Sequence, residues 1–451
     1  MKKSIFAVFV VGLFIFFTCE VLSVLAAESA KKKKAPTGKP FSGTTLHALM
    51  EDIVDTHAIE PFLPEFESLT GIKVVFEKMN YNDMHEKLVP QLMAGEGNGS
   101  YDFIETDNYW VGEFVMAGWV RPIDDYLKKT PDIKLENYID AVISMFTVGD
   151  KKYFIPMWSY PMGLLYRTDI VGDPNFHKFY EKKTGKKWAF PPKDLYEYSA
   201  MAKAANDFTP DDVYGVAMQG AKIDPLVMEL TNYVYAMGGD YYDRKKWDAT
   251  FDSKQCMEAL KVYQDLLKNA AQPGASGAIF DDAIIVFQQG KAVFALTYNF
   301  TMVYLMDKKH STVYDRVDFI PLPGGGLQGG WGWAIPVSSP NPDAAWEFLK
   351  WVESKEMQKR RAMGGGMPSA KWVYNDKEFL GKYPYQKGAG RMIAIDKAFP
   401  IISQSTRMIE IIGEYSSSAL IGDITIEEAV RKANQELNQI VDGDPLVEMQ
   451  K

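Results

Sequence analysis

The sequence has only two cysteines in 451 residues, Cys19 and Cys256, and neither lies in a Cys-x-x-Cys motif. A disulfide scaffold and a cysteine-ligated zinc site are therefore excluded. Cys256 lies in a helical pattern, where a single cysteine is usually a small buried hydrophobic residue. The fold must be stabilised by packing of apolar side chains.

Histidine is also scarce, and the motifs of the common catalytic sites are missing. None of the five histidines belongs to a His-x-x-x-His pair. The glycine runs at Gly324 and Gly364 lack the Lys-Ser/Thr that follows a phosphate loop, and no Gly-x-Ser-x-Gly motif is present. We therefore expect no metal, no cofactor and no catalytic residue.

The chain has no excess of positive charge, since its net charge is -9 and its pI is near 5.3. This balance disfavours nucleic acid and anionic lipid as partners, because both bind clustered lysine and arginine. The one basic run, residues 31–34, precedes Pro36, Gly38 and Pro40. We predict a disordered segment over residues 28–40.

The N-terminus has the three parts of a secretory signal peptide: Lys2 and Lys3, an apolar run over residues 5–17, and small residues at Ala26 and Ala27. We predict a signal peptide over residues 1–27 and a periplasmic mature protein. An uncleaved membrane anchor is one alternative, which Glu20 disfavours. Lipid attachment at Cys19 is another, although residues 17–19 lack the small residue that normally precedes a lipidated cysteine.

With 47% hydrophobic and 24% charged residues, the chain has the composition of a folded protein, and its length allows two or three domains. Residues 45–50, 72–78 and 103–106 are predicted strands, and helices are predicted near residues 59–69 and 84–94. This alternation predicts a parallel sheet covered by helices.

A second block of the same kind begins near Gly163. It comprises strands at residues 164–167, 214–219 and 292–298, with helices near residues 193–205, 225–237, 254–269 and 281–289. The glycine-rich residues 324–330 are expected to be flexible, and residues 331–337 could cross between the two blocks. Beyond Asn341 the pattern is mostly helical, including residues 426–441.

Ligands of open α/β sheets bind outside the carboxyl ends of the strands. In the first block, the residues after the strands include Glu51, Asp52, Tyr81, Asp107 and Asn108. Carboxylates and amides at this edge are suited to bind hydroxyl groups. For Asp107 and Asn108 the alternative is a helix cap.

Several segments, taken in order, are similar to the family 1 extracellular solute-binding proteins of sugar importers, which include maltose-binding protein. These segments span residues 101–108, 118–124, 153–158, 164–167, 273–275, 287–292, 295–299, 321–325, 330–332 and 344–351. The resemblance covers most of residues 44–445.

The resemblance implies an α/β fold of two lobes, the type II periplasmic-binding-protein fold, with a ligand cleft at the hinge. Lobe one would hold residues 41–158 and 333–385, and lobe two residues 159–332 and 386–451. It also implies capture of a sugar, oligosaccharide or polyol by lobe closure, without catalysis. The further partners would be the membrane permease subunits of an ABC importer, and the protein itself would be a monomer.

A sugar needs polar side chains for its hydroxyl groups and aromatic rings for its C–H faces. The candidate ligand-binding residues are Glu51, Asp52, Tyr81, Asp107, Asn108, Trp158, Gln219, Asp224, Tyr298, Asn299, Trp331 and Arg407. Core packing is the alternative for the aromatic residues, and a surface ion pair is the alternative for Arg407. A glycosidase also stays open, because it needs only two suitably spaced carboxylates and the chain has 59 acidic residues.

Overall fold

The computed structural model describes residues 38–222 and 224–450. The predicted signal peptide, Cys19 and residues 28–37 of the predicted disordered segment lie outside these ranges. Residues 38–40 are described, and the Lys39 ammonium there donates to the backbone carbonyl of Ser68 at 2.7 Å. Within the described ranges, no helix combines the length and apolar character needed to cross a membrane.

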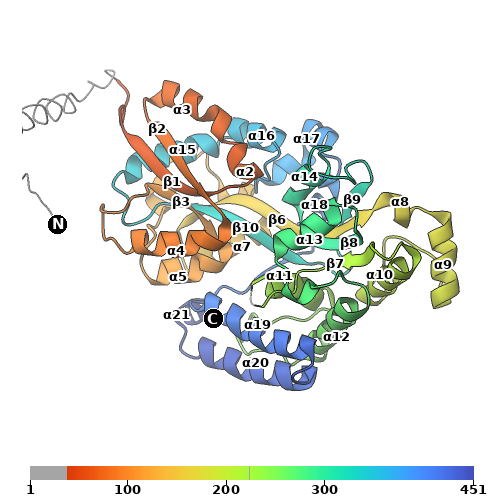
Figure 1. Cartoon of the computed structure of the whole chain (residues 1–451). Coiled ribbons are helices and arrows are strands. Elements are labelled where there is room, and N and C mark those ends of the chain that lie inside the picture. The colour runs from red at the N-terminus through yellow and green to blue at the C-terminus, as the bar shows by residue number, and fades with distance from the viewer. Residues whose placement is uncertain (1–37, 223, 451) are drawn as a thin grey trace, which may run out of the picture.

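Strands and helices alternate along the chain (Figure 1). The strands are β1 Thr45–Glu51, β2 Lys73–Met79, β3 Phe103–Asp107, β4 Thr147–Val148, β5 Lys151–Lys152, β6 Phe154–Arg167, β7 Tyr214–Ala217, β8 Ala292–Tyr298, β9 Val317–Ile320, β10 Leu327–Ala334 and β11 Lys397–Ala398. The α-helices are α2 Val54–His57, α3 Leu63–Thr70, α4 Tyr81–Leu92, α5 Val111–Met116, α6 Asp124–Lys129, α7 Asp140–Met145, α8 Thr168–Val171, α9 Pro174–Thr184, α10 Leu195–Phe208, α11 Asp224–Ala236, α12 Lys254–Asn269, α13 Phe280–Gln288, α14 Met302–Leu305, α15 Pro342–Val352, α16 Lys355–Met363, α17 Lys377–Lys382, α18 Gln386–Met392, α19 Ser405–Ile421, α20 Ile426–Val441 and α21 Pro445–Gln450.

The first three strands form the predicted parallel sheet. β1 pairs with β2 in register from Thr45 opposite Lys73 to Glu51 opposite Met79, and β3 pairs on the other side of β1. Since parallel strands run the same way, their carboxyl ends meet at one edge of the sheet. Glu51 and Asp107, the last residues of β1 and β3, therefore lie at that edge.

The two halves of the molecule share one mixed sheet of order β2-β1-β3-β10-β6-β8-β7, with β9 on β6 and β11 on β10. The long strand β6 makes this continuity possible: residues 154–161 pair with β10, and residues 162–167 pair with β8 and β9. β10 in turn pairs with β3. The predicted two-lobed α/β architecture is confirmed, with β6 and β10 crossing between the lobes.

The glycine-rich segment before Trp331 is more ordered than expected. Gly324 and Gly325 have φ angles of +99° and +92° and form a turn, but β10 already begins at Leu327, and Gly330 is buried within it. A Cβ atom on Gly330 would lie 2.8 Å from the carbonyl oxygen of Trp158. Glycine is required here by close strand approach, so the expectation of a flexible segment was wrong.

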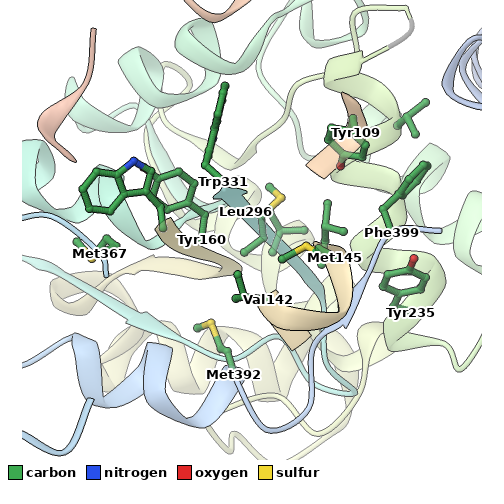
Figure 2. Packing of buried hydrophobic residues seen from close by; sticks show 14 of the residues in the cluster. Tyr109, Val142, Met145, Tyr160, Tyr235, Leu296, Trp331, Met367, Met392 and Phe399 are labelled. Carbon is green, nitrogen blue, oxygen red and sulfur yellow. The ribbon is translucent and has the colours of Figure 1, made fainter. Parts of the chain in front are cut away.

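Buried side chains continue across the crossing strands without a break. Figure 2 shows Val142 and Met145 of α7 packed beside the strands that carry Tyr160 and Trp331. The C-terminal region also joins the two sides: Phe399 contacts the ring of Tyr109 with centroids 5.0 Å apart. The predicted lobe two thus touches lobe one beyond the crossing strands.

The helices of the second lobe confirm much of the predicted pattern. α12 and α20 begin and end at the predicted residues, as does strand β8. In Figure 1, α19 and α20 lie beside α12 at the lower edge of the molecule. Cys256 of α12 is fully buried, as predicted, and burial raises the pKa of its thiol to about 11.

Replacing Gly330 with alanine should separate β10 from β6. The added Cβ would meet the Trp158 carbonyl at 2.8 Å and the Met145 methyl at 3.0 Å. We expect the free energy of unfolding to fall by about 1–3 kcal/mol, as for other overpacked sites, in denaturant unfolding.

Gly381→Ala is the matched control, because no atom lies within 4 Å of the added Cβ and the residue is inside α17. This variant should keep or slightly gain stability. An equal loss in both variants would contradict the close-approach argument.

Candidate ligand-binding site

A cavity of about 720 Å³ lies between the two lobes. Its walls come from the ends of β1, β3 and β8, from the middle of β6 and β10, and from the first turns of α4, α11 and α13. The lining residues are Glu51, Asp52, Ile53, Asn80, Tyr81, Asp107, Asn108, Tyr109, Tyr160, Gln219, Asp224, Pro225, Met228, Ile279, Phe280, Asp281, Ile284, Ile285, Gln288, Tyr298, Phe300, Thr301, Tyr304, Gly329, Gly330 and Trp331.

Nine of the twelve candidate residues lie on this cavity. They are Glu51, Asp52, Tyr81, Asp107, Asn108, Gln219, Asp224, Tyr298 and Trp331. Six of them come from lobe-one strand ends or the β10 crossing and three from lobe two. The structure thus brings together side chains that are up to 280 positions apart in the chain, from Glu51 to Trp331.

The carboxyl edge of the first sheet supplies the acidic wall. Asp107 is opposite Trp331 in the β3–β10 pairing, so the acid and the ring are neighbours across the strands. Asp107 also accepts the backbone N–H of Tyr109 at 3.3 Å and caps the short 3-10 helix Asn108–Trp110. Asp107 therefore both caps this helix and lines the cavity.

Gln219 is the most informative side chain on the second lobe. It is 2% exposed, it lines the cavity, and neither its amide oxygen nor its amide nitrogen has a hydrogen-bond partner within the described residues. An unsatisfied buried polar group costs about 1–3 kcal/mol. A ligand with a hydroxyl group at this position would satisfy both atoms.

Aromatic rings form two opposite walls of the cavity. On the lobe-one side, Tyr81 and Trp331 are in edge contact with ring centroids 5.9 Å apart. On the lobe-two side, Tyr298 stacks on Phe300 with an interplanar angle of 13°, and Phe280 lies 5.9 Å from Tyr298. Flat apolar faces of this kind suit the C–H surfaces of a sugar or polyol.

The other three candidate residues do not line the cavity. Trp158 is completely buried, with the Arg361 guanidinium 4.8 Å from its ring centre. Asn299 is also completely buried, at the start of the turn that follows β8. Arg407 lies on α19 and forms ion pairs with Glu410 at 3.0 Å and Glu436 at 2.9 Å, the predicted alternative.

Several lining residues were not among the candidates. Tyr160 belongs to the part of β6 that the sequence pattern did not resolve, and α13 contributes Phe280, Asp281 and Ile285 from its first two turns. Helix α13 was predicted, but its position beside β8 depends on tertiary packing. Of these residues only Tyr160 had a local signal, because it follows the apolar run that starts at Phe154.

Burial and mutual repulsion raise the pKa values of the acids around the floor of the cavity. Burial is the main cause for Asp107, whose pKa is raised to about 7, and for Glu105 beneath it, whose pKa is raised to about 8. Burial also raises the pKa of Glu51, with repulsion from Glu105 and Asp107 as the next causes. Asp55, completely buried, has a pKa of about 7 for the same main reason.

Asp52 behaves differently because it is exposed and paired. His57 hydrogen-bonds to it at 2.8 Å and Lys78 lies 3.7 Å away, and the hydrogen bond with His57 is the main reason that its pKa is lowered. Across residues 38–222 and 224–450, no three histidine, cysteine or acidic side chains are grouped so as to hold a metal ion. The cavity is suited to hydrogen bonding and ring contact.

Comparison with known proteins gives a consistent result. A sequence profile of the family described as bacterial extracellular solute-binding protein matches residues 52–359. A mannitol-binding protein of Pseudomonas aeruginosa is 23% identical over 82% of this chain and 86% of that protein. A probable amino-acid ABC transporter periplasmic-binding protein of Sinorhizobium fredii is 21% identical over 90% and 91%.

The fold is also found among solved structures. An ABC transporter solute-binding protein of Agrobacterium radiobacter K84, in complex with ribitol, superposes with a TM-score of 0.74. It is 22% identical, and the match covers 89% of this chain and 100% of that one. At this identity the comparison establishes the two-lobed fold.

The raised pKa values predict a pH-dependent stability. A carboxyl group with a folded-state pKa above its ordinary value favours folding most at low pH, and this contribution is lost as the pH rises to the folded pKa. For Glu105 the window runs from its ordinary value of 4.5 to about 8. In Glu105→Gln, the fall in unfolding free energy between pH 5 and pH 8 should be smaller by up to about 1.4 kcal/mol per pH unit.

The measurement is denaturant unfolding at several pH values. Glu356→Gln is the control, because Glu356 is exposed on α16 and pairs with Arg360. Its profile should follow that of the unaltered protein. An unchanged profile in Glu105→Gln would refute the assignment of a buried, protonated carboxyl group.

Proposed function

Because this chain belongs to the bacterial extracellular solute-binding protein family, we propose that it captures a sugar or polyol between its lobes for an ABC importer. The protein acts as a monomer on the outer side of the cytoplasmic membrane, after export by its signal peptide. The lobes close on the solute, and the permease subunits bind the closed complex. The solute is released unchanged.

The observation that carries this proposal is the two-sided lining of the cavity. Asp107 and Trp331 on one side, and Gln219 and Tyr298 on the other, combine hydrogen-bonding groups with ring faces. A volume of about 720 Å³ is within the usual range for small-molecule sites. The mannitol-binding relative and the ribitol complex support polyols as the first compounds to test.

An amino acid is the alternative ligand that one relative's name suggests. Its α-carboxylate would need a cationic or strongly donating partner in the site. Among the described residues, the lining contains five carboxyl groups and no lysine, arginine or histidine. The charge of the cavity therefore favours a polyhydroxylated ligand over an amino acid.

Lobe closure follows from the division of contacts. A ligand that touches both lobes binds the closed state more tightly than the open state and shifts the equilibrium toward it. β6 and β10 are the crossing strands about which the lobes would rotate. The permease would then distinguish loaded from empty protein by shape.

Trp331→Ala should weaken binding of the polyol or sugar that the unaltered protein binds. The substitution removes the ring that lies next to Asp107 and Tyr81, so we expect a loss of at least about tenfold in affinity, equivalent to about 1.4 kcal/mol. A thermal-shift screen of ribitol, mannitol and maltose would identify the ligand, and titration calorimetry would measure it.

Trp372→Ala is the matched control, since Trp372 is a partly buried tryptophan that does not line the cavity. It should bind with unaltered affinity. Equal losses in both variants would contradict this location for the site. Recovery of a cleaved or otherwise altered sugar after incubation would contradict binding without catalysis and favour a glycosidase.

Closure can be measured in solution. Small-angle X-ray scattering with saturating ligand should give a smaller radius of gyration than scattering without it, because the lobes approach each other. Trp331→Ala at the same ligand concentration should show a smaller change. An identical radius of gyration with and without bound ligand would refute closure while leaving binding intact.

A further inference from the structure

We propose that the natural ligand carries a protonated amine on a polyhydroxylated frame, as an amino sugar or an amino polyol does. This inference rests on the proposed function, since it specifies the solute that the same cavity takes. It is carried by the charge of the lining, by the placement of aromatic rings around two of the acids, and by the free amide of Gln219.

The lining is strongly one-sided in charge. Five carboxyl groups face the cavity: Glu51, Asp52, Asp107, Asp224 and Asp281. No lysine, arginine or histidine lines the cavity within residues 38–222 and 224–450. Two more acids, Asp55 and Glu105, are completely buried near the floor, and their repulsion contributes to the raised pKa of Glu51.

The cations near the cavity already have partners. Lys78 and His57 pair with Asp52 at the rim. Arg361 is completely buried and pairs with Glu353 at 2.9 Å. His85 partly offsets the rise in the pKa of Asp224 that burial causes, and its ring is hydrogen-bonded to Glu113 at 2.8 Å. Among the described residues, none forms an ion pair with Glu51, Asp107, Asp224 or Asp281 within 4.0 Å.

Asp107 and Asp224 come from opposite lobes, at the end of β3 and the start of α11. After burial, repulsion from Asp224 is one of the causes that raise the pKa of Asp107. Repulsion from the same two acids is among the causes that raise the pKa values of Tyr81, Tyr109 and Tyr298, after burial. Two carboxyl groups and three tyrosine rings therefore surround one part of the cavity.

An ammonium group fits such a place in two ways. Its N–H groups donate to carboxylates in short, strong hydrogen bonds, and its charge is attracted to the faces of tyrosine and tryptophan rings. Trp331 completes the ring set on the lobe-one side. A neutral hydroxyl group would use the hydrogen bonds but not the charge.

The positive charge also removes an obstacle to closure. Bringing Asp224 toward Asp107 as the lobes close moves like charges together in a space from which water is expelled. A neutral ligand leaves this repulsion in place unless a carboxyl group takes up a proton. An ammonium group between the two acids turns the repulsion into attraction.

Gln219 indicates that the ligand is more than a simple amine. Its side-chain amide is buried, lines the cavity and has no partner among the described residues, so it can both donate and accept. A hydroxyl group satisfies both functions, and an ammonium group satisfies only the acceptor. The cavity thus combines an amine position with at least one hydroxyl position.

The test compares ligands that differ by one group. D-glucitol is matched with 1-amino-1-deoxy-D-glucitol, and D-glucose with D-glucosamine, by titration calorimetry at constant pH and salt. In at least one pair the amine should bind at least about tenfold more tightly than the neutral compound. Putrescine, an amine without hydroxyl groups, should bind more weakly than the amine of that pair.

Asp224→Asn should reduce the preference for the amine to about threefold or less, because it removes one of the two facing charges and keeps the side-chain volume. Asp107→Asn should also reduce the preference, with circular dichroism as the check on folding. Asp125→Asn is the matched control: Asp125 is exposed on α6, pairs with Lys128 and does not line the cavity. It should retain the full preference.

The outcomes separate the two proposals. Neutral compounds that bind as tightly as their amines in both pairs, or a preference that survives in Asp224→Asn, would overturn the amine inference and leave polyol capture standing. Putrescine binding with no polyhydroxylated compound bound would overturn the proposed ligand class. No binding of any of the five compounds, nor of ribitol, mannitol or maltose, would overturn both.

Discussion

The pairing of β10 with β6 is the constraint on which the rest of the structure depends. These two strands carry the chain between the lobes, and β10 also holds β3, whose last residue is Asp107. Gly330 lets the two backbones approach at the point where a side chain would meet the Trp158 carbonyl. On its other side, β10 pairs with β3 and so places Trp331 beside Asp107 at the cavity.

The acids that this frame gathers are costly to the folded protein. Glu105 and Asp55 are completely buried, and they accept backbone N–H donors from Glu51 and Met367, respectively. Burial raises their pKa values to about 8 and about 7, so folding favours their protonated forms near neutral pH. A fold under selection for stability alone would replace such groups with apolar side chains of similar size.

Much of the architecture could be predicted from the sequence, because local patterns determine it. The alternation of strands and helices, the parallel first sheet and the polar groups at its carboxyl edge follow from periodicity and from the geometry of parallel strands. What could not be predicted depends on packing between distant segments. Periodicity does not distinguish Trp158, which packs on Arg361, from Trp331, which faces the cavity. Nor does it place α13 beside β8.

The candidate site also contains residues that local sequence patterns predict and residues that they do not. The acids of lobe one lie at strand ends, where topology alone predicts convergence, and all five candidates from those ends line the cavity. On lobe two, Gln219 and Asp224 lie between β7 and the first turn of α11 and line the cavity. Asn299 and Arg407 do not line it. A residue that follows a strand or lies in a polar stretch has several possible neighbours, so its sequence position alone does not place it in the site. The acids at the strand ends of lobe one and Asp224 of lobe two therefore line the same cavity. Under the proposed closure, the lobe movement and the charge of the ligand would depend on the same pair of side chains. A ligand that neutralises Asp107 and Asp224 together would also stabilise the closed protein.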